Sequence, residues 1–231
     1  MSLTVQAFGQ DIWIASGPTV VAAAGFHYPT RMTLIRLVNG QLVVVSPIGL
    51  TGELRQAVDA LGQVCFLVAP NSLHHVFMSD WQDAYPAART FAAPGLASKR
   101  PDLKIDATFD MAQIAEWNGQ LEHVAMRGNA ITTEVVFFHR PSATVIFTDL
   151  LQNFPKDWFL GWRSVIAKLD LMAEPRPTVP RKFRLAFRRR TEARAALQAV
   201  LKWPSDKVLM AHGDPVQANG RAFIRQAFEW L

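Results

Sequence analysis

Two adjacent histidines, His74 and His75, follow an apolar run at residues 64–68, at the point where a strand should end and a loop begin. Asp149 and His212 follow later runs of the same kind, so each also stands at the carboxyl end of an expected strand. A sheet can bring such strand ends together even when they lie far apart in the sequence. Three imidazoles and a carboxylate are ligands that divalent transition metals prefer. The pattern therefore indicates a metal site.

The same residues also have a purely structural interpretation. The two histidines can be ordinary loop residues, and Asp149 can cap the turn that follows it. Asp214, two positions beyond His212, could orient an imidazole ligand or cap the turn at Pro215. The remaining histidines stand outside the strand-end pattern, so we expect them on the surface or hydrogen-bonded in the core: His27, His123 and His139.

The composition is that of a globular protein. With 231 residues, 50% of them hydrophobic, the chain can bury a substantial core, and we expect one domain over residues 1–231. The single cysteine, Cys65, stands in an apolar run and is expected to be an inert core residue. The amino terminus lacks a basic and apolar signal segment, and no apolar run approaches about 18 residues. These features predict a soluble, cytoplasmic protein.

Positive charge is concentrated in one segment. The formal net charge is +5, and the basic segment, residues 176–190, carries seven lysines and arginines and no acidic residue. It could make weak contacts with phosphates or an anionic membrane surface, although a solvated loop and helix face is the simpler interpretation. The aromatic residues show no pattern typical of nucleic-acid stacking, so we do not expect a nucleic-acid partner. The oligomeric state stays open.

The elements that must position the candidate ligands alternate between strands and helices. Asn39-Gly40 lies between two apolar runs and predicts a hairpin, because both residues tolerate positive φ. A helix is expected over residues 51–61, with Thr51 capping its start. The order continues with strands 64–68 and 89–93 around helix 76–85, strands 121–125, 132–139 and 144–149, and later helices around strand 207–211. This order predicts an α/β (α+β) fold in which mixed sheets pack between helical layers.

A further helix is expected to begin at Pro155. Five large apolar residues follow at helical spacing, which is typical of an amphipathic helix with one apolar face. We expect this face to pack against the core: Trp158, Trp162, Val165, Ile166 and Leu169.

Three segments carry a resemblance to a known family. Residues 28–32, 68–75 and 211–215 resemble the DUF4336 branch of the metallo-β-lactamase-fold superfamily. The resemblance extends over nearly the whole chain. It implies a four-layer αββα sandwich of mixed sheets, with metal ions at the rim of the two sheets.

The resemblance also implies which metal ligands remain. Members of the superfamily usually have two metal sites, and the histidines of the first site correspond here to Pro70, Ser72 and Asn129. The positions of the second site correspond to four residues that can all bind a metal: His74, His75, Asp149 and His212. The resemblance thus implies one divalent metal, with zinc preferred over iron or manganese.

A single metal in this setting implies a hydrolase. It could activate water for attack on a small-molecule ester, lactone, amide or phosphoester, with Asp149 and His74 as the catalytic residues. Four protein ligands would close the coordination sphere, however, and catalysis needs an open position. The alternative is a catalytically degenerate binding protein that keeps the fold and docks through its basic segment.

Overall fold

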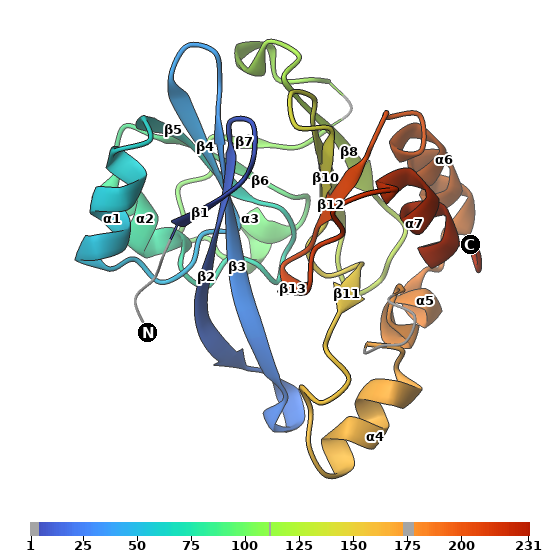
Figure 1. Ribbon diagram of the computed structural model, residues 1–231. Coiled ribbons are helices and arrows are strands. Elements are labelled where there is room, and N and C mark those ends of the chain that lie inside the picture. Colours follow the sequence, from blue (N-terminus) through green and yellow to red (C-terminus); the bar gives the residue numbers. More distant parts are fainter. Residues whose placement is uncertain (1–4, 111, 173–177) are drawn as a thin grey trace.

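The computed structural model describes residues 5–110, 112–172 and 178–231, which form two main sheets between layers of helices (Figure 1). The first sheet has seven strands in sequence order: β1 (Val5–Gly9), β2 (Ile12–Val21), β3 (His27–Arg36), β4 (Gln41–Val45), β5 (Gln63–Ala69), β6 (Arg89–Ala92) and β7 (Ala107–Thr108). The second sheet has the order β12 (Lys207–Leu209), β10 (Thr144–Ile146), β9 (Glu134–His139) and β8 (Leu121–Met126). A short parallel pair is formed by β11 (Gln152–Asn153) and β13 (His212–Gly213).

The first sheet changes from antiparallel to parallel pairing at β4. Strands β1 to β4 are antiparallel, and the turn between β3 and β4 contains the predicted Asn39-Gly40, with Gly40 at φ 82°. From β4 onward the strands are parallel and are joined through helices α1 (Gly52–Asp59), α2 (Met78–Ala84) and α3 (Leu96–Lys99). As predicted, Thr51 caps α1. Parallel strands share their carboxyl ends at one edge, which places the loop after β5 at the rim of the sheet.

Three hydrophobic layers hold the sheets and helices together. The first lies between the first sheet and helices α1 to α3 and includes Trp81. The second lies between the two sheets and includes Phe137. The third lies between the second sheet and helices α5 (Arg181–Ala186), α6 (Arg190–Val200) and α7 (Gly220–Ala227). The order of layers is helix, sheet, sheet, helix, which is the predicted αββα arrangement (Figure 1).

Helix α4 (Trp162–Leu169) differs from the prediction. It begins at Trp162 rather than at Pro155, and its apolar face is exposed. The exposed fractions on that face are 52% for Trp162, 58% for Val165, 43% for Ile166 and 60% for Leu169, and Trp158 before the helix is 39% exposed. The prediction that this stripe packs against the core is therefore wrong.

The opposite side of α4 packs onto a small cluster outside the three main layers. Ala167 is the buried residue of the helix, and the rest of the cluster consists of Phe26, Phe154, Phe159 and Met172. Arg163 Nε donates a hydrogen bond to Ala24 O at 3.1 Å, which ties α4 to the 3₁₀ turn η1 (Ala23–Gly25) after β2. Helical spacing identifies an apolar face but not the neighbour that covers it.

The remaining helical element is a second 3₁₀ turn, η2 (Ala115–Trp117), which precedes β8. Its Trp117 is buried between the two sheets. In the described ranges, no helix combines the length and apolar character needed to cross a membrane.

Candidate metal centre

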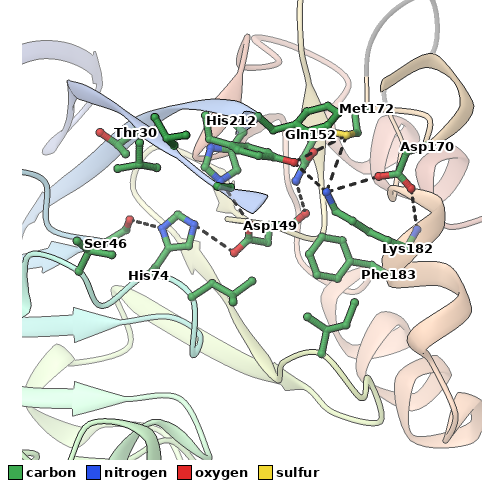
Figure 2. Close-up of a pocket in the computed structure, with 18 of the residues that line it drawn as sticks. Thr30, Ser46, His74, Asp149, Gln152, Asp170, Met172, Lys182, Phe183 and His212 are labelled. Carbon is green, nitrogen blue, oxygen red and sulfur yellow. Dashed lines mark hydrogen bonds and ion pairs between the residues drawn. The ribbon is translucent and has the colours of Figure 1, made fainter. Parts of the chain in front are cut away.

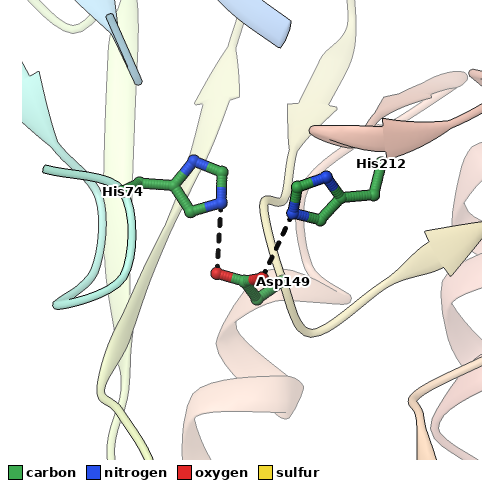
Figure 3. A group of neighbouring side chains, drawn as sticks. All are labelled: His74, Asp149 and His212. Atoms are coloured by element: carbon green, nitrogen blue, oxygen red, sulfur yellow. Dashed lines mark ion pairs between the residues drawn. The ribbon is translucent and has the colours of Figure 1, made fainter. Parts of the chain in front are cut away.

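Three residues from distant parts of the sequence meet at the rim of the two sheets. His74 lies in the loop after β5, Asp149 follows β10, and His212 begins β13. Each offers one ligand atom, a ring nitrogen or a carboxylate oxygen, and these atoms lie within 4.8 Å of one another (Figure 3). Within the part of the chain that the structure describes, this is the group of histidine, cysteine or acidic side chains that is close enough to hold a metal ion.

Asp149 lies between the two histidine rings. Its Oδ2 is 3.1 Å from His74 Nε2, and its Oδ1 is 3.3 Å from His212 Nε2. The three side chains are nearly enclosed, with exposed fractions of 8% for Asp149, 6% for His212 and 11% for His74. Both rings therefore direct Nε2 toward the same buried carboxylate.

The other nitrogen of each ring is held by a neighbour. His212 Nδ1 lies 2.8 Å from Pro29 O. Because a carbonyl oxygen only accepts hydrogen bonds, Nδ1 carries the hydrogen, and the neutral ring keeps its lone pair on Nε2. His74 Nδ1 lies 2.7 Å from Ser46 Oγ, which can donate or accept. Partners of this kind fix the orientation of imidazole ligands in metal sites.

Backbone contacts position the segment that carries His212. Strand β13 pairs in parallel with β11. Gly213 has φ +93°, and a Cβ at this position would lie 1.9 Å from Asn153 O, so the close approach requires glycine. Arg31 Nη1 donates hydrogen bonds to Met210 O and Gly213 O, each at 2.6 Å. These contacts tie the segment to β3 and to β11.

Asn71, which the sequence pattern did not indicate as a site residue, links the loop of His74 to Asp149. It is fully buried, and its Nδ2 donates to Asp149 Oδ2 at 2.7 Å and to Thr148 Oγ1 at 2.9 Å. Its Oδ1 accepts hydrogen bonds from the backbone N–H groups of Leu73 and His74, at 2.7 and 3.0 Å. One amide group therefore positions two of the three convergent residues.

Glu134, at the start of β9, holds the loop that carries Asp149. Its buried carboxylate accepts hydrogen bonds from the backbone N–H groups of Thr148, Asp149 and Leu150, at 2.9, 2.7 and 3.0 Å. The sequence pattern did not indicate this residue either. The available signal was an acidic residue at the start of the apolar run 134–138, because a buried carboxylate is costly unless it is hydrogen-bonded.

The electrostatics of the three residues favour a charged Asp149. Burial raises the pKa of Asp149, but the charge of His74 and the hydrogen bonds that both rings donate when protonated hold the pKa well below its usual range. For His74, burial lowers the pKa, and the nearby Asp149 carboxylate outweighs this effect and raises the pKa. Burial and then the charge of Asp149 raise the pKa of Glu134. The enclosed Asp149 carboxylate thus favours a positive charge beside it.

His75 does not join this group. Its Nδ1 accepts a hydrogen bond from Arg100 Nη1 at 2.9 Å, because a guanidinium only donates. Burial, Lys99 and Arg100 lower the pKa of His75. Asp214 is exposed, and the ring nitrogen that it could have oriented is held by Pro29 O. The structure therefore brings together three of the four candidate ligands.

The residues at the positions of the superfamily's first metal site make structural contacts. Pro70 O accepts a hydrogen bond from the backbone of β9 at 2.8 Å. Ser72 Oγ lies 2.9 Å from Thr132 Oγ1. Asn129 Nδ2 donates to Phe183 O at 2.9 Å, which ties the loop after β8 to α5. These side chains and backbone groups connect the two sheets and a helix at the rim.

An apolar pocket of about 560 Å³ opens beside the three convergent residues, which form part of its wall (Figure 2). Most of the remaining lining is apolar. A polar exception is Lys182 of α5, whose Nζ lies 3.0 Å from Tyr28 Oη and 3.5 Å from Asp170 Oδ2. A pocket of this composition suits a small, largely apolar molecule that carries a few polar groups.

Residues 11–159 match the family described as Domain of unknown function (DUF4336). The chain belongs to the DUF4336 family. The matched part of this DUF4336 chain includes His74 and Asp149, and His212 lies beyond it. The comparison with curated proteins gives no match.

Solved structures similar to this DUF4336 protein include several metallo-β-lactamases. The mono-zinc form of FIM-1 from Pseudomonas aeruginosa is 11% identical, with a TM-score of 0.67 and coverage of 100% of this chain and 96% of that chain. A metallo-β-lactamase from Pontibacter korlensis is 13% identical, with a TM-score of 0.65 and coverage of 99% of each chain. The metal-soaked Flv1 flavodiiron core from Synechocystis sp. PCC6803 is 13% identical, with a TM-score of 0.67 and coverage of 99% and 60%. The predicted metallo-β-lactamase fold is thereby confirmed.

Proposed function

We propose that this DUF4336 protein is a mononuclear metal-dependent hydrolase that uses a metal-activated water on a small, largely apolar ester, lactone, amide or phosphoester. His74, Asp149 and His212 would be the metal ligands. The observation that carries the proposal is the convergence of these three residues in the wall of an apolar pocket. A single metal is compatible with the fold, since one structural neighbour was crystallised in a mono-zinc form.

The donor set fits a divalent metal. Two imidazoles and a carboxylate are ligands typical of zinc, and iron and manganese are alternatives. In His212, the hydrogen bond to Pro29 O leaves the lone pair on the nitrogen that faces Asp149. With His75 turned to Arg100, three protein ligands remain, which is the number found in catalytic rather than structural zinc sites. When bound, the metal supplies a Lewis acid that makes water a nucleophile near neutral pH.

The surrounding residues support such a site. Asn71 and Glu134 hold the Asp149 segment through hydrogen bonds, and the rings of the two histidines are held by Ser46 and Pro29. The apolar walls exclude water around a bound substrate, which strengthens electrostatic interactions inside the pocket. Lys182 places a positive charge in the same pocket, where it could bind an anionic oxygen of the substrate.

Metal analysis of the purified protein tests the proposal. We expect about one equivalent of a divalent metal per chain, most of which is lost in His212→Ala. Hydrolysis of aryl esters or lactones should disappear when the metal is removed and return with zinc. His75→Ala is a matched control, because it removes a neighbouring histidine outside the group, and it should keep the metal. Equal metal content in the wild type and His212→Ala, or none in either, would exclude the proposal.

A catalytically degenerate binding protein is the second candidate function. It is supported by the structural contacts of Pro70, Ser72 and Asn129, and by the ion pairs that can balance Asp149 without a metal. Its basic segment is exposed at Arg188, Arg189 and Arg190, whereas Arg176 and Pro177 lie outside the described residues. A metal-free protein that hydrolyses none of the four substrate classes, and whose stability is unchanged by zinc, would favour this function.

A further inference from the structure

Most of the exposed large apolar side chains line the pocket or lie in residues 158–169. Among the described residues, only Val38 and Leu185 are exposed apolar side chains of this size that neither line the pocket nor lie in residues 158–169. We call the exposed apolar residues of the pocket lining and of residues 158–169 together the docking face. The pocket lining contributes Val21, Leu73, Val76 and Ile131, and residues 158–169 contribute Trp158, Leu160, Trp162, Val165 and Leu169. Ile166 belongs to both sets. A contiguous apolar area on a protein surface marks a contact site.

Helix α4 forms the centre of the docking face. Its four exposed apolar residues follow the i, i+3, i+4, i+7 spacing of one helical side, while Ala167 on the other side is buried. Figure 1 shows α4 at one end of the molecule, near the tip of the hairpin formed by β2 and β3. The hydrogen bond from Arg163 to Ala24 O joins these two parts. The helix is therefore fixed with its apolar side outward, in the orientation opposite to that of an ordinary surface helix.

The part of the sequence that contains α4 also carries a net positive charge. Residues 154–190 contain ten lysines and arginines and three acidic residues, a formal charge of +7, whereas the whole chain has +5. The remainder of the chain is therefore net negative. The cations that the structure shows as exposed here are Lys156, Lys168, Arg181, Arg188, Arg189 and Arg190. In addition, the guanidinium of Arg163 lies 4.6 Å from the centre of the Trp162 ring.

We propose that the docking face binds the surface of anionic lipid bilayers. Tryptophan and aliphatic side chains can enter the boundary between head groups and acyl chains, while lysines and arginines contact the acidic head groups. A second copy of the chain is a less suitable partner, because a two-fold interface would place the same cations opposite one another, where they repel. A nucleic acid would match the charge but leave the exposed aliphatic side chains in water. Helix α4 has eight residues, so it would lie on the bilayer.

Docking in this way would bring the pocket to the lipid, because Ile166 belongs both to the pocket lining and to α4. The identity of the substrate rests on the proposed function: it would be an apolar ester, lactone, amide or phosphoester that enters from the bilayer. Docking itself requires neither a metal nor hydrolysis. The two proposals can therefore fail independently.

Vesicle flotation with the full, chelator-treated chain tests the docking. We expect binding to phosphatidylcholine vesicles that contain phosphatidylglycerol, and about tenfold weaker binding to phosphatidylcholine alone. Trp162→Ser/Leu169→Ser should weaken binding to the anionic vesicles about tenfold or more. Lys168→Glu/Arg181→Glu should weaken it to a similar extent, without affecting the neutral vesicles. Val38→Ser is the matched control, because Val38 is 82% exposed outside the docking face, and it should bind like the wild type.

Several outcomes would overturn the docking proposal. One is the absence of flotation with either vesicle at low ionic strength, and another is equal binding by the wild type and Trp162→Ser/Leu169→Ser. A dimer that this variant abolishes without changing vesicle binding would assign the face to a second copy. A DNA duplex that binds more tightly than anionic vesicles would assign the charge to nucleic acid. Since all substituted side chains are exposed, the variants should keep the thermal midpoint of the wild type.

Discussion

The candidate metal centre depends on the residues that position the candidate ligands as much as on the candidate ligands themselves. Asp149 is buried, and a buried carboxylate is tolerated only when hydrogen bonds or opposite charges replace its water. Asn71 supplies a donor to Asp149, and Glu134 fixes the backbone on which Asp149 stands. The position of the carboxylate is therefore set by two residues that would not touch a bound metal.

Glu134→Gln should destabilise the protein by about 2 kcal/mol. Both carboxylate oxygens of Glu134 accept backbone hydrogen bonds, Oε1 from Thr148 and Oε2 from Asp149 and Leu150. Whichever way the amide of glutamine is placed, its NH₂ group therefore faces a backbone N–H. Urea unfolding at neutral pH measures the loss. Glu116→Gln is the control, because the Glu116 side chain is 47% exposed and its ion pair with Arg89 contributes little; equal midpoints for the two variants would contradict the assigned role.

At the scale of elements, the sequence predicts the strand ends well because alternation and apolar runs are local signals. His74, Asp149 and His212 stand at the ends of the predicted strands, and the Asn39-Gly40 hairpin is formed as predicted. The choice between His74 and His75 depends on the loop conformation, which Asn71 fixes by accepting hydrogen bonds from the loop backbone. Asn71 is in turn held by Thr148 and Asp149, and these long-range contacts require knowledge of the tertiary structure.

Helix α4 shows the same limit on a larger element. Its apolar residues are spaced as in a core helix, but only the side that contains Ala167 packs against the small cluster beside it. Periodicity in one segment cannot indicate whether a neighbour is available to cover its apolar face. The roles of Asn71 and Glu134 were missed for the same reason, because the contact of each with Asp149 joins residues more than ten positions apart in the sequence.

Gly213→Ala should destabilise the protein by about 3 kcal/mol or more, since the new Cβ would lie 1.9 Å from Asn153 O and separate β13 from β11. Gly40→Ala is a matched control. It has a similar positive φ of +82°, but nothing lies within 4 Å of the added Cβ, so its cost should be about 1 kcal/mol. Denaturant unfolding of both variants gives the difference. Equal losses would show that only the backbone conformation matters at Gly213.

His139, at the end of β9, should make the protein less stable in acid. Burial lowers the pKa of His139 to about 4, and its Nε2 has no hydrogen-bond partner in the described part of the chain. In the unfolded chain His139 is protonated below about pH 6.5, whereas in the folded chain it is protonated only below about pH 4. The free energy of unfolding therefore falls by about 3 kcal/mol as the pH decreases through this window. The free energy of unfolding of His139→Asn should fall less steeply over this window. Parallel curves for the two proteins would contradict the prediction.

At the scale of the whole molecule, the candidate site joins parts that are separate in the sequence and in the layers. His74 follows a strand of the first sheet, Asp149 follows a strand of the second, and His212 belongs to the short pair that β3 supports through Arg31. The three candidate ligands can therefore meet only when both sheets have packed face to face. An ion bound there would stabilise the folded chain relative to the unfolded one.

Zinc at about one hundred times its dissociation constant should stabilise the chelator-treated protein by about 2.7 kcal/mol, which corresponds to a rise of about 5 to 10 °C in the thermal midpoint. We expect residues 1–231 to unfold in one transition. The thermal midpoint should rise by the same amount in His75→Ala, because His75 lies outside the group of three candidate ligands. It should not rise in His212→Ala, because His212 is one of the three. Scanning calorimetry with and without zinc measures these shifts. A rise of equal size in His212→Ala would place the zinc elsewhere on the protein. The absence of a rise in the wild type would indicate that the three residues form a metal-free ion-pair network that holds the sheets together.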